Sequence, residues 1–269
     1  MLELYQFELS QFSEKVRLIL DYKGLEYRKI EVTPGIGQLD VFRMSGQRKV
    51  PVLKDGERVI ADSTAIARYL EEQYPQNPIL PADPKQKGLC LMMEEWADQS
   101  LGVNSRKILL KAIGQSQEYR TSWLPAETPD PIRDLVSAVP SDLVNLLGVG
   151  VGVGPDVLKE AEGEIEQDLE SLCLLLGEGN SYLVTDRPTL ADLTVAALSI
   201  LLKFPEGSYL DLPASLQGKG VPGIADNPDY ANFFMWRDRI YRQFRNPLNG
   251  SPSSDTTGGG SSPTRIEIE

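Results

Sequence analysis

The strongest constraint on the fold is the order of periodic segments at the start of the chain. Residues 2–7, "LELYQF", form a short apolar and aromatic run typical of a buried strand. Residues 10–24 carry apolar side chains at helical spacing, with Ser10 or Ser13 as the predicted N-cap and Gly24 as the C-terminal residue. Residues 25–32 alternate like a strand. Residues 2–32 therefore predict a β-α-β unit with parallel strands.

The next segments complete the same unit. After a loop that holds a proline and two glycines, residues 39–45 predict a short helix. Residues 50–62 predict a hairpin with its turn at Asp55–Gly56. Residues 62–75 predict a helix that begins at Asp62 or Ser63. The predicted order is β-α-β-α-β-β-α over a domain of residues 1–77.

Beyond this domain the pattern changes from mixed to helical. Residues 75–86 hold four prolines, which predicts a linker, placed at 78–87 between the domains. The rest, 88–246, predicts an all-helical domain, and we expect 247–269, rich in Gly, Ser, Thr and Pro, to be disordered. The predicted helices lie at 88–114 (one helix or two), 156–179, 189–204 and 228–244. Residues 189–204 are apolar nearly all round, which predicts a buried central helix.

An insertion at 115–155 separates two of these helices. It is longer than a simple helix connection and ends in the glycine-rich stretch "GVGVGVGP". Glycines spaced by two match neither the dinucleotide-binding pattern nor the phosphate-loop pattern, so nucleotide binding here is the weaker interpretation.

The composition excludes several kinds of chemistry. The chain has no histidine, which excludes a Ser-His-Asp or Cys-His nucleophile and any His-ligated zinc or haem. Its net charge of −12 argues against nucleic-acid binding. The two cysteines, Cys90 and Cys173, lie in apolar helical contexts, so we expect buried free thiols and a reducing, cytoplasmic compartment. No signal peptide and no apolar run long enough to span a membrane is visible, and no metal is expected.

Four motifs in order resemble the glutathione transferase superfamily. Residues 4–27 resemble the first strand, active-site turn and first helix of its serine- and cysteine-type members. Residues 49–53, "KVPVL", resemble the segment with a cis proline that binds the glutathione backbone, and residues 61–70 the turn that holds the γ-glutamyl end. Residues 187–197 resemble the family's capping box, with Thr189 as N-cap and Asp192 three residues on. The resemblance implies an α+β two-domain fold, thioredoxin-like and then all-helical.

The resemblance also implies a catalytic residue. Ser10 stands at the strand-to-helix turn where the family has its catalytic Ser or first Cys. Its hydroxyl would hold the glutathione sulfur as a thiolate, although Ser10 is also explained by a helix cap alone. Ser13 takes the second position of the family's C-x-x-C, so disulfide exchange by the protein is not expected there. Tyr5, in the first strand, ranks below Ser10.

A set of neighbouring residues is implied to bind glutathione. These residues are Phe12, Arg48, Lys49, Val50, Pro51, Asp62 and Ser63. The residue before a proline favours an extended backbone, which allows Val50 to pair with the peptide backbone of the ligand. Asp62 and Ser63, at a helix start, offer a hydroxyl and backbone N–H groups to a carboxylate, or they only cap the helix. Arg48 and Lys49 are candidates for the glycyl carboxylate.

Residues 10–32 and 48–53 also resemble the membrane-associated prostaglandin E synthase type 2 proteins. Those proteins have C-x-x-C at this turn and extra sequence between the helices of the second domain. The 115–155 insertion fits that layout, as a lid or substrate wall, or as an apolar contact with a membrane surface or a protein partner.

Three functions follow from these resemblances. The first is a glutathione-dependent transferase that conjugates glutathione to a small hydrophobic electrophile. The second is a non-catalytic binding or scaffold protein of the same fold, and the third is an isomerase or haem-linked protein of the prostaglandin synthase type, for which the absence of histidine counts against haem. The family is often dimeric, so a homodimer is expected.

Overall fold

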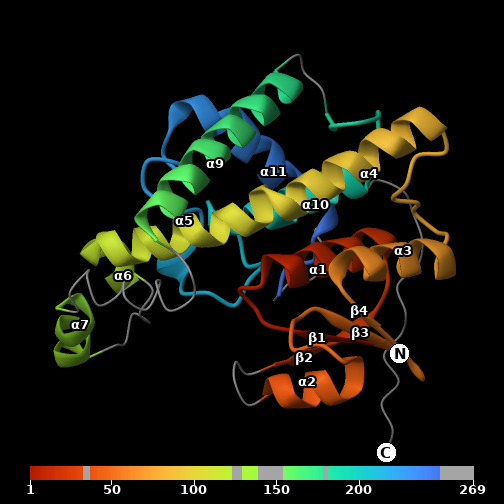
Figure 1. Cartoon of the computed structure of the whole chain (residues 1–269), viewed down its shortest axis with the longest axis horizontal. Helices are drawn as coiled ribbons and strands as arrows, with labels where there is room; N and C mark the ends of the chain where they lie inside the picture. Colours follow the sequence, from red (N-terminus) through yellow and green to blue (C-terminus); the bar gives the residue numbers. More distant parts are fainter. Residues whose placement is uncertain (33–36, 123–128, 139–153, 178–180, 249–269) are drawn as a thin grey trace, which may run out of the picture.

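A computed structural model describes residues 1–32, 37–122, 129–138, 154–177 and 181–248. The chain begins with a sheet domain and continues into a helical domain, as Figure 1 shows. Much of the 115–155 insertion, including the glycine-rich stretch except for Gly154, lies outside the described residues, as do residues 249–269 of the expected tail.

The sheet has four strands in the order β2-β1-β3-β4. These strands are β1 (Leu2–Gln6), β2 (Tyr27–Glu31), β3 (Val52–Asp55) and β4 (Arg58–Ala61). β1 pairs with β2 in parallel and with β3 in antiparallel orientation, and β3 and β4 form an antiparallel hairpin. The parallel pair confirms the predicted β-α-β unit.

Two strand boundaries differ from the prediction. β2 begins at Tyr27 because Gly24 adopts a left-handed conformation at the end of the first helix, and the N–H of Leu25 still donates to Leu20. The hairpin turn lies one residue later than predicted, since Asp55 pairs with Arg58 in the ladder and Gly56, at φ +58°, begins the turn.

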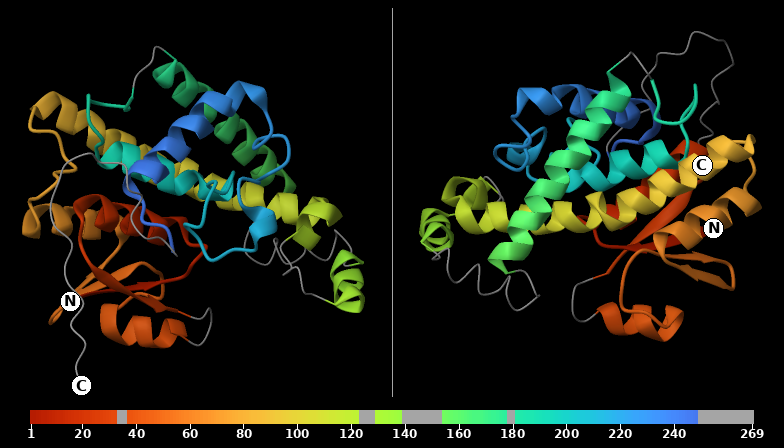
Figure 2. Two further views of the ribbon diagram at one scale, coloured as in Figure 1. Left: turned by 180° about the vertical axis from the view of Figure 1, so that it is seen from behind. Right: turned by 45° about the horizontal axis from the view of Figure 1, so that its top comes forward.

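Helices cover both faces of this sheet. α1 (Gln11–Lys23) and α3 (Ser63–Gln73) lie on the face toward the helical domain, and α2 (Gly37–Ser45) lies on the other, as Figures 1 and 2 show. The small apolar cluster of Val32, Val41 and Val52 packs beneath α2, whereas the large cluster continues from the sheet through α1 into the helical domain. The two domains therefore share one hydrophobic core.

The helical domain starts inside the predicted linker. Asp83 caps the first turn by accepting from the N–H of Gln86, and Pro84 occupies the first helical position, so this proline begins a helix. The helices α4 (Pro84–Gln99) and α5 (Leu101–Gln115) form one long rod with a break at Ser100 (Figures 1 and 2). The segment predicted as one helix or two therefore forms two helices. The later helices are α6 (Gln117–Ser122), α7 (Asp130–Ser137), α9 (Pro155–Leu176), α10 (Leu190–Leu198) and α11 (Ala231–Phe244).

The central helix of this domain is α10, in which every residue is buried. The carboxylate of Asp192 accepts from the N–H and hydroxyl of Thr189 and from the N–H of Leu183. These bonds satisfy amide groups at the helix start, where no intrahelical partner exists. The cap thus lets an almost wholly apolar helix begin in the interior.

The cysteines are unpaired. Cys90 is buried in α4, whereas Cys173 in α9 is only half-buried, so the expectation of a buried thiol is wrong for that residue. Among the helices that the structure describes, none combines the length and apolar character needed to cross a membrane.

Candidate functional site

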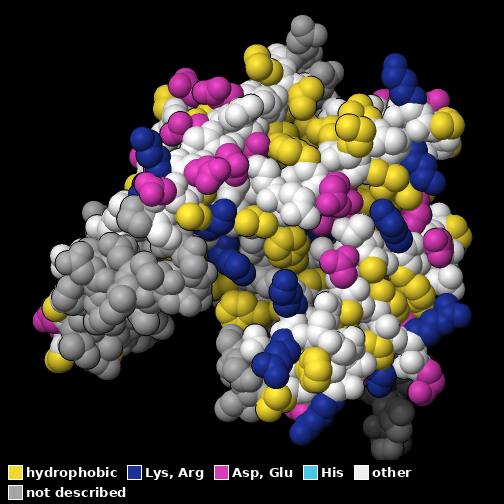
Figure 3. Space-filling model, viewed as in Figure 1, with side chains coloured by type: hydrophobic (Ala, Val, Ile, Leu, Met, Phe, Trp, Pro, Cys, Tyr) yellow, Lys and Arg dark blue, Asp and Glu magenta, His cyan; other side chains and the backbone are white. Residues whose placement is uncertain are grey.

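A pocket of about 770 Å³ lies between the sheet domain and the helical domain. Its sheet-domain wall is formed by the turn before α1, the segment before β3 and the start of α3, and its other wall by α4 and α5. Figure 3 shows this face of the molecule, with Lys and Arg side chains around the hollow and hydrophobic side chains within it. A volume of this size suits a small-molecule site.

The structure brings all the predicted catalytic and glutathione-binding residues to this pocket. They come from three separate segments of the sheet domain and are Ser10, Phe12, Arg48, Lys49, Val50, Pro51, Asp62 and Ser63. Tyr5 does not line the pocket; it packs against the cluster beneath α2. The fold brings these segments together. The end of β1, the start of β3 and the end of β4 lie at the same edge of the sheet, and α1 and α3 begin beside that edge.

Ser10 is the N-cap of α1. Its backbone is extended, at φ −78° and ψ 110°, and its Oγ accepts a hydrogen bond from the N–H of Ser13 at 3.2 Å. No described residue accepts a bond from its hydroxyl proton, which leaves that proton for a group in the pocket. Ser10 can therefore cap α1 with its oxygen and donate its hydroxyl proton to a ligand at the same time. The positive end of the α1 dipole also lies at Ser10.

Ser13 has a different environment. Its side chain is fully buried and does not line the pocket, and its Oγ has no hydrogen-bond partner in the described part of the chain. This position lies behind the turn, so Ser13 contributes its N–H to the cap of Ser10 rather than a second group to the pocket.

The segment before β3 presents its backbone to the pocket. The Val50–Pro51 peptide bond is cis, as the resemblance implies, and both residues line the pocket. Beside them Arg48 and Lys49 are exposed, and the guanidinium of Arg48 lies 5.6 Å from the ring centre of Phe42. These two cations give this end of the pocket a positive character.

The start of α3 has an unusual backbone. Asp62, not Ser63, is the N-cap, and one carboxylate oxygen accepts from the N–H groups of Thr64 and Ala65, both at 3.0 Å. Asp62 lies at φ 82° and ψ 132°, a conformation that costs a residue other than glycine on the order of 1–3 kcal/mol. Strain of this kind persists where neighbouring contacts hold it. Ser63, only 3% exposed, is the next residue and lines the pocket.

Several pocket residues were missed from the sequence. On the helical side they are Asp98, Gln99, Gly102, Val103, Arg106, Leu109, Leu110 and Ile113. Their helical spacing along α4 and α5 was a usable signal, but the same spacing also describes a helix face packed in a core. Arg106 is exposed and adds a cation to a mainly apolar wall.

Gln11 is a further residue that was missed. It is 4% exposed, lines the pocket, and its side-chain amide donates to the carbonyl oxygen of Gly102 at 2.6 Å. This bond joins the first turn of α1 to α5 across the domain boundary. It therefore fixes the two walls of the pocket relative to each other beside Ser10.

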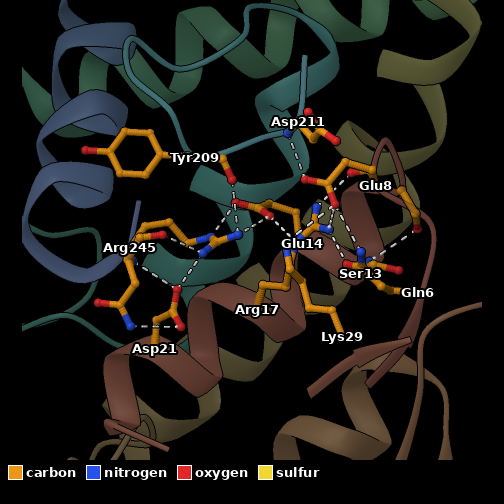
Figure 4. A network of polar contacts seen from close by, with 12 residues as sticks. Gln6, Glu8, Ser13, Glu14, Arg17, Asp21, Lys29, Tyr209, Asp211 and Arg245 are labelled. Carbon is orange, nitrogen blue, oxygen red and sulfur yellow. Dashed lines mark hydrogen bonds and ion pairs between the residues drawn. The ribbon is translucent and has the colours of Figure 1, made fainter. Parts of the chain in front are cut away.

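Charged residues of α1 are buried where the amphipathic pattern predicted a single apolar face. Glu14, Lys15 and Arg17 are all fully buried. Figure 4 shows that the Glu14 carboxylate lies between Arg17 of the same helix and Arg245, which follows α11. Burial alone would raise the pKa of Glu14, but the two guanidinium groups outweigh it and hold the pKa of this carboxyl below its usual value of 4.5.

The same network ties α1 to the sheet. Arg17 donates to the side chain of Gln6 and to the backbone carbonyl of Glu8 at 2.8 Å, and both acceptors lie at or near the end of β1 (Figure 4). The turn that carries Ser10 is therefore held from both sides, by Arg17 at the sheet and by Arg245 at the C-terminal segment.

The fold and the site together define a two-domain protein with a thioredoxin-like domain, a helical domain and a pocket between them. Residues 4–78 match the family "Glutathione S-transferase, N-terminal domain". They are therefore a glutathione S-transferase N-terminal domain, and the chain has the two-domain fold of that superfamily, which confirms the resemblance seen in the sequence. The resemblance to prostaglandin E synthase type 2 proteins stays a prediction.

Relatives of this chain include a "Glutathione S-transferase zeta class" from Euphorbia esula. It is 35% identical over 128 residues, which cover 46% of this chain and 57% of the relative. A "Maleylpyruvate isomerase" from Ralstonia sp is 39% identical over 130 residues, covering 45% of this chain and 61% of the relative. The chain spans about half the length of the curated relatives it matches.

A solved structure supports the fold over most of the chain. The β-etherase LigF from Sphingobium sp. strain SYK-6 aligns with a TM-score of 0.63, at 22% identity, over 89% of this chain and 94% of its own. The structural alignment therefore extends into the helical domain.

Proposed function

We propose that this chain is a glutathione-dependent enzyme whose site is the pocket at the start of α1. The observation that carries the proposal is the Ser10 hydroxyl, which lines the pocket, accepts from the Ser13 N–H and donates its proton to no residue that the structure describes. A thiol has a pKa of about 8.5, and a helix N-terminus with a hydroxyl donor lowers it. Ser10 would thus hold the glutathione sulfur as the nucleophilic thiolate.

The remaining pocket residues suit the rest of glutathione, which is a peptide with a carboxylate at each end. Val50 offers its backbone to the cysteinyl part, as an added strand would. Arg48 and Lys49 are cations for the glycyl carboxylate, and the N–H and hydroxyl of Ser63 suit the γ-glutamyl carboxylate. Phe12 lies beside Ser10 and packs toward α5 at Gly102.

For the second substrate we propose a small hydrophobic electrophile. The helical wall offers Val103, Leu109, Leu110 and Ile113, which would contact an apolar group. The thiolate would attack the electrophilic carbon, and the leaving group would depart with the bonding electrons. Ser10 would stabilise the sulfur before the attack and take no covalent part.

A glutathione-dependent isomerase is the second candidate. Arg106, on the same wall, is the observation that favours it, because a guanidinium recognises a carboxylated co-substrate. The relative named maleylpyruvate isomerase is consistent with this alternative. A non-catalytic scaffold, the remaining alternative, would leave the uncommitted Ser10 hydroxyl without a role.

We further propose a homodimer in a reducing cytoplasm. The free thiols of Cys90 and Cys173 fit that compartment. Helix α4 carries an exposed apolar stripe, which we define as Leu89 and Met92, 47% and 72% exposed. Exposed apolar stripes of this kind mark protein interfaces, so the stripe is the proposed dimer surface.

Two measurements on the purified chain test the proposed function. Isothermal titration with glutathione measures binding, and turnover of a generic aryl halide with glutathione measures conjugation. Saturable binding with turnover supports the transferase. Binding without aryl-halide turnover, but with isomerisation of a carboxylated alkene, supports the isomerase. Absence of glutathione binding contradicts both and favours the scaffold.

A further inference from the structure

Behind the start of α3 lies a buried ionic cluster, defined here as Lys15, Thr64, Glu94 and Asp98. The ammonium of Lys15 donates to Glu94 at 2.5 Å and to Asp98 at 2.8 Å, and it lies 3.3 Å from the hydroxyl of Thr64. The side chain of Lys15 is 0% exposed, that of Glu94 2% and that of Asp98 13%. The cluster joins α1, α3 and α4.

Asp98 lines the pocket itself, and Thr64 is the member that connects the cluster to the Asp62–Ser63 turn. Its hydroxyl lies 2.5 Å from Glu94 and 3.0 Å from Asp98, and its one proton bonds either carboxylate while its oxygen accepts from Lys15. Its backbone N–H donates to Asp62. Thr64 does not itself line the pocket, whereas Asp62 and Ser63 do.

The strained backbone of Asp62 needs contacts that hold it. Asp62 caps the N-terminal turn of α3. A shift of that turn away from α4 would release the strain in the Asp62 backbone. The Thr64 hydroxyl opposes this shift because it is bonded to side chains on two other helices. The Lys15–Glu94 and Lys15–Asp98 ion pairs remain when the hydroxyl is removed, so α1 and α4 stay joined.

We propose that Thr64 is a positioning residue, which holds the Asp62–Ser63 turn in the conformation that receives the γ-glutamyl end of glutathione. The proposal rests on the proposed function, and it adds a device that the pocket residues themselves do not supply. Its effect is confined to one end of the ligand. The thiolate end depends on Ser10 at the start of α1, whereas the Thr64 hydroxyl reaches α1 at Lys15, more than one turn further along the helix.

The experiment compares Thr64→Val with a matched control. Valine has nearly the shape of threonine and removes only the hydroxyl. Thr194→Val is the control, since Thr194 is a fully buried threonine in α10 whose hydroxyl has no partner among the described residues. Two probes are titrated by calorimetry against each protein: S-hexylglutathione, and S-hexyl-cysteinylglycine, which lacks the γ-glutamyl group.

We expect Thr64→Val to weaken the binding of S-hexylglutathione by about five- to tenfold, the net contribution of roughly one hydrogen bond. Thr64→Val should bind S-hexyl-cysteinylglycine with the same affinity as the original chain. Thr194→Val should bind both probes with the affinities of the original chain. In turnover, KM for glutathione should rise while kcat at saturating glutathione stays the same. A merely structural role would weaken both probes alike.

Equal affinity of Thr64→Val and the original chain for S-hexylglutathione would overturn the positioning role and leave the proposed function intact. A parallel loss with both probes would overturn it as well. Failure of the original chain to bind S-hexylglutathione would overturn both the positioning role and the proposed function.

Discussion

The guanidinium of Arg245 lies 3.0 Å from the carboxylate of Glu14, although 231 residues separate the two in the sequence. A second nitrogen of Arg245 lies 2.7 Å from Asp21, two helical turns further along α1. All three side chains are at most 3% exposed. The segment after α11 thus fastens the helix whose first turn carries Ser10 (Figure 4).

Arg245→Met should destabilise the fold strongly. The substitution leaves Asp21 without its guanidinium partner and Glu14 with Arg17 alone, and breaking a buried ion pair from one side costs about 3–5 kcal/mol. Urea unfolding followed by circular dichroism measures the change. Arg43→Met is the control, because Arg43 pairs with Asp40 where both side chains are more than 75% exposed. Equal stability of the two variants would show that the Arg245 pairs contribute nothing.

Glu14 should contribute to the acid sensitivity of the fold. Its pKa is lowered in the folded state, so its stabilising effect is present above its ordinary pKa of 4.5 and is lost as the pH falls through the lowered pKa. Glu14→Gln should be less stable at neutral pH, and its deficit should shrink as the pH falls below 4.5. Unfolding free energies across this range test this. The exposed Glu57→Gln is the control for the substitution itself, and a constant Glu14→Gln deficit at all pH values would refute the assignment.

Gly102 should tolerate no side chain at the domain boundary. A Cβ there would lie 3.0 Å from Cζ of Phe12 and 3.3 Å from Cδ1 of Leu198. Gly102→Ala should therefore cost about 1–3 kcal/mol and displace Phe12, which raises KM for glutathione. Gly163→Ala, in an exposed position of α9 with nothing within 4 Å, should stabilise the fold by about 0.5–1 kcal/mol. Thermal unfolding compares them, and a neutral Gly102→Ala would contradict the tight contact.

The α4 stripe of Leu89 and Met92 should mediate self-association. Met92, 72% exposed, lies within it, and a charge there would be desolvated in an interface. Met92→Lys should convert a dimer to monomer in size-exclusion chromatography with light scattering. Met235→Lys is the control, since Met235 in α11 is 64% exposed and lies outside the stripe. A monomeric original chain, or a Met92→Lys variant that stays dimeric, would exclude this surface.

The site segments were predictable because each is short and marked by local chemistry. Ser10 follows a strand and begins a helix, Pro51 precedes a strand, and Asp62 caps a helix, so period and turn residues locate these segments, and the family resemblance implies their roles in the site. The order of strands and helices then predicts that their ends meet, as the sheet shows.

The contacts between distant segments were not predictable in this way. A helical pattern assigns Glu14, Lys15 and Arg17 to a polar face, and nothing local indicates that Arg245, Glu94 and Asp98 cover that face. Charged residues are rarely fully buried unless they are paired, and the partners here come from other helices. Arg106 was missed because one helix face serves both the core and the pocket.

The central claim is that the Ser10 hydroxyl stabilises the glutathione thiolate, and the pH dependence of thiolate formation tests it most directly. Thiolate absorbance of bound glutathione is titrated in the original chain, in Ser10→Ala and in Ser10→Asp, which keeps a capping oxygen but at neutral pH has no proton to donate. We predict a pKa of the bound thiol below its free value of about 8.5 in the original chain, and a higher one in both variants. We also predict that Ser10→Asp retains stability that Ser10→Ala loses, by about 1 kcal/mol. An unchanged thiol pKa in both variants would contradict the claim and leave Ser10 as a helix cap.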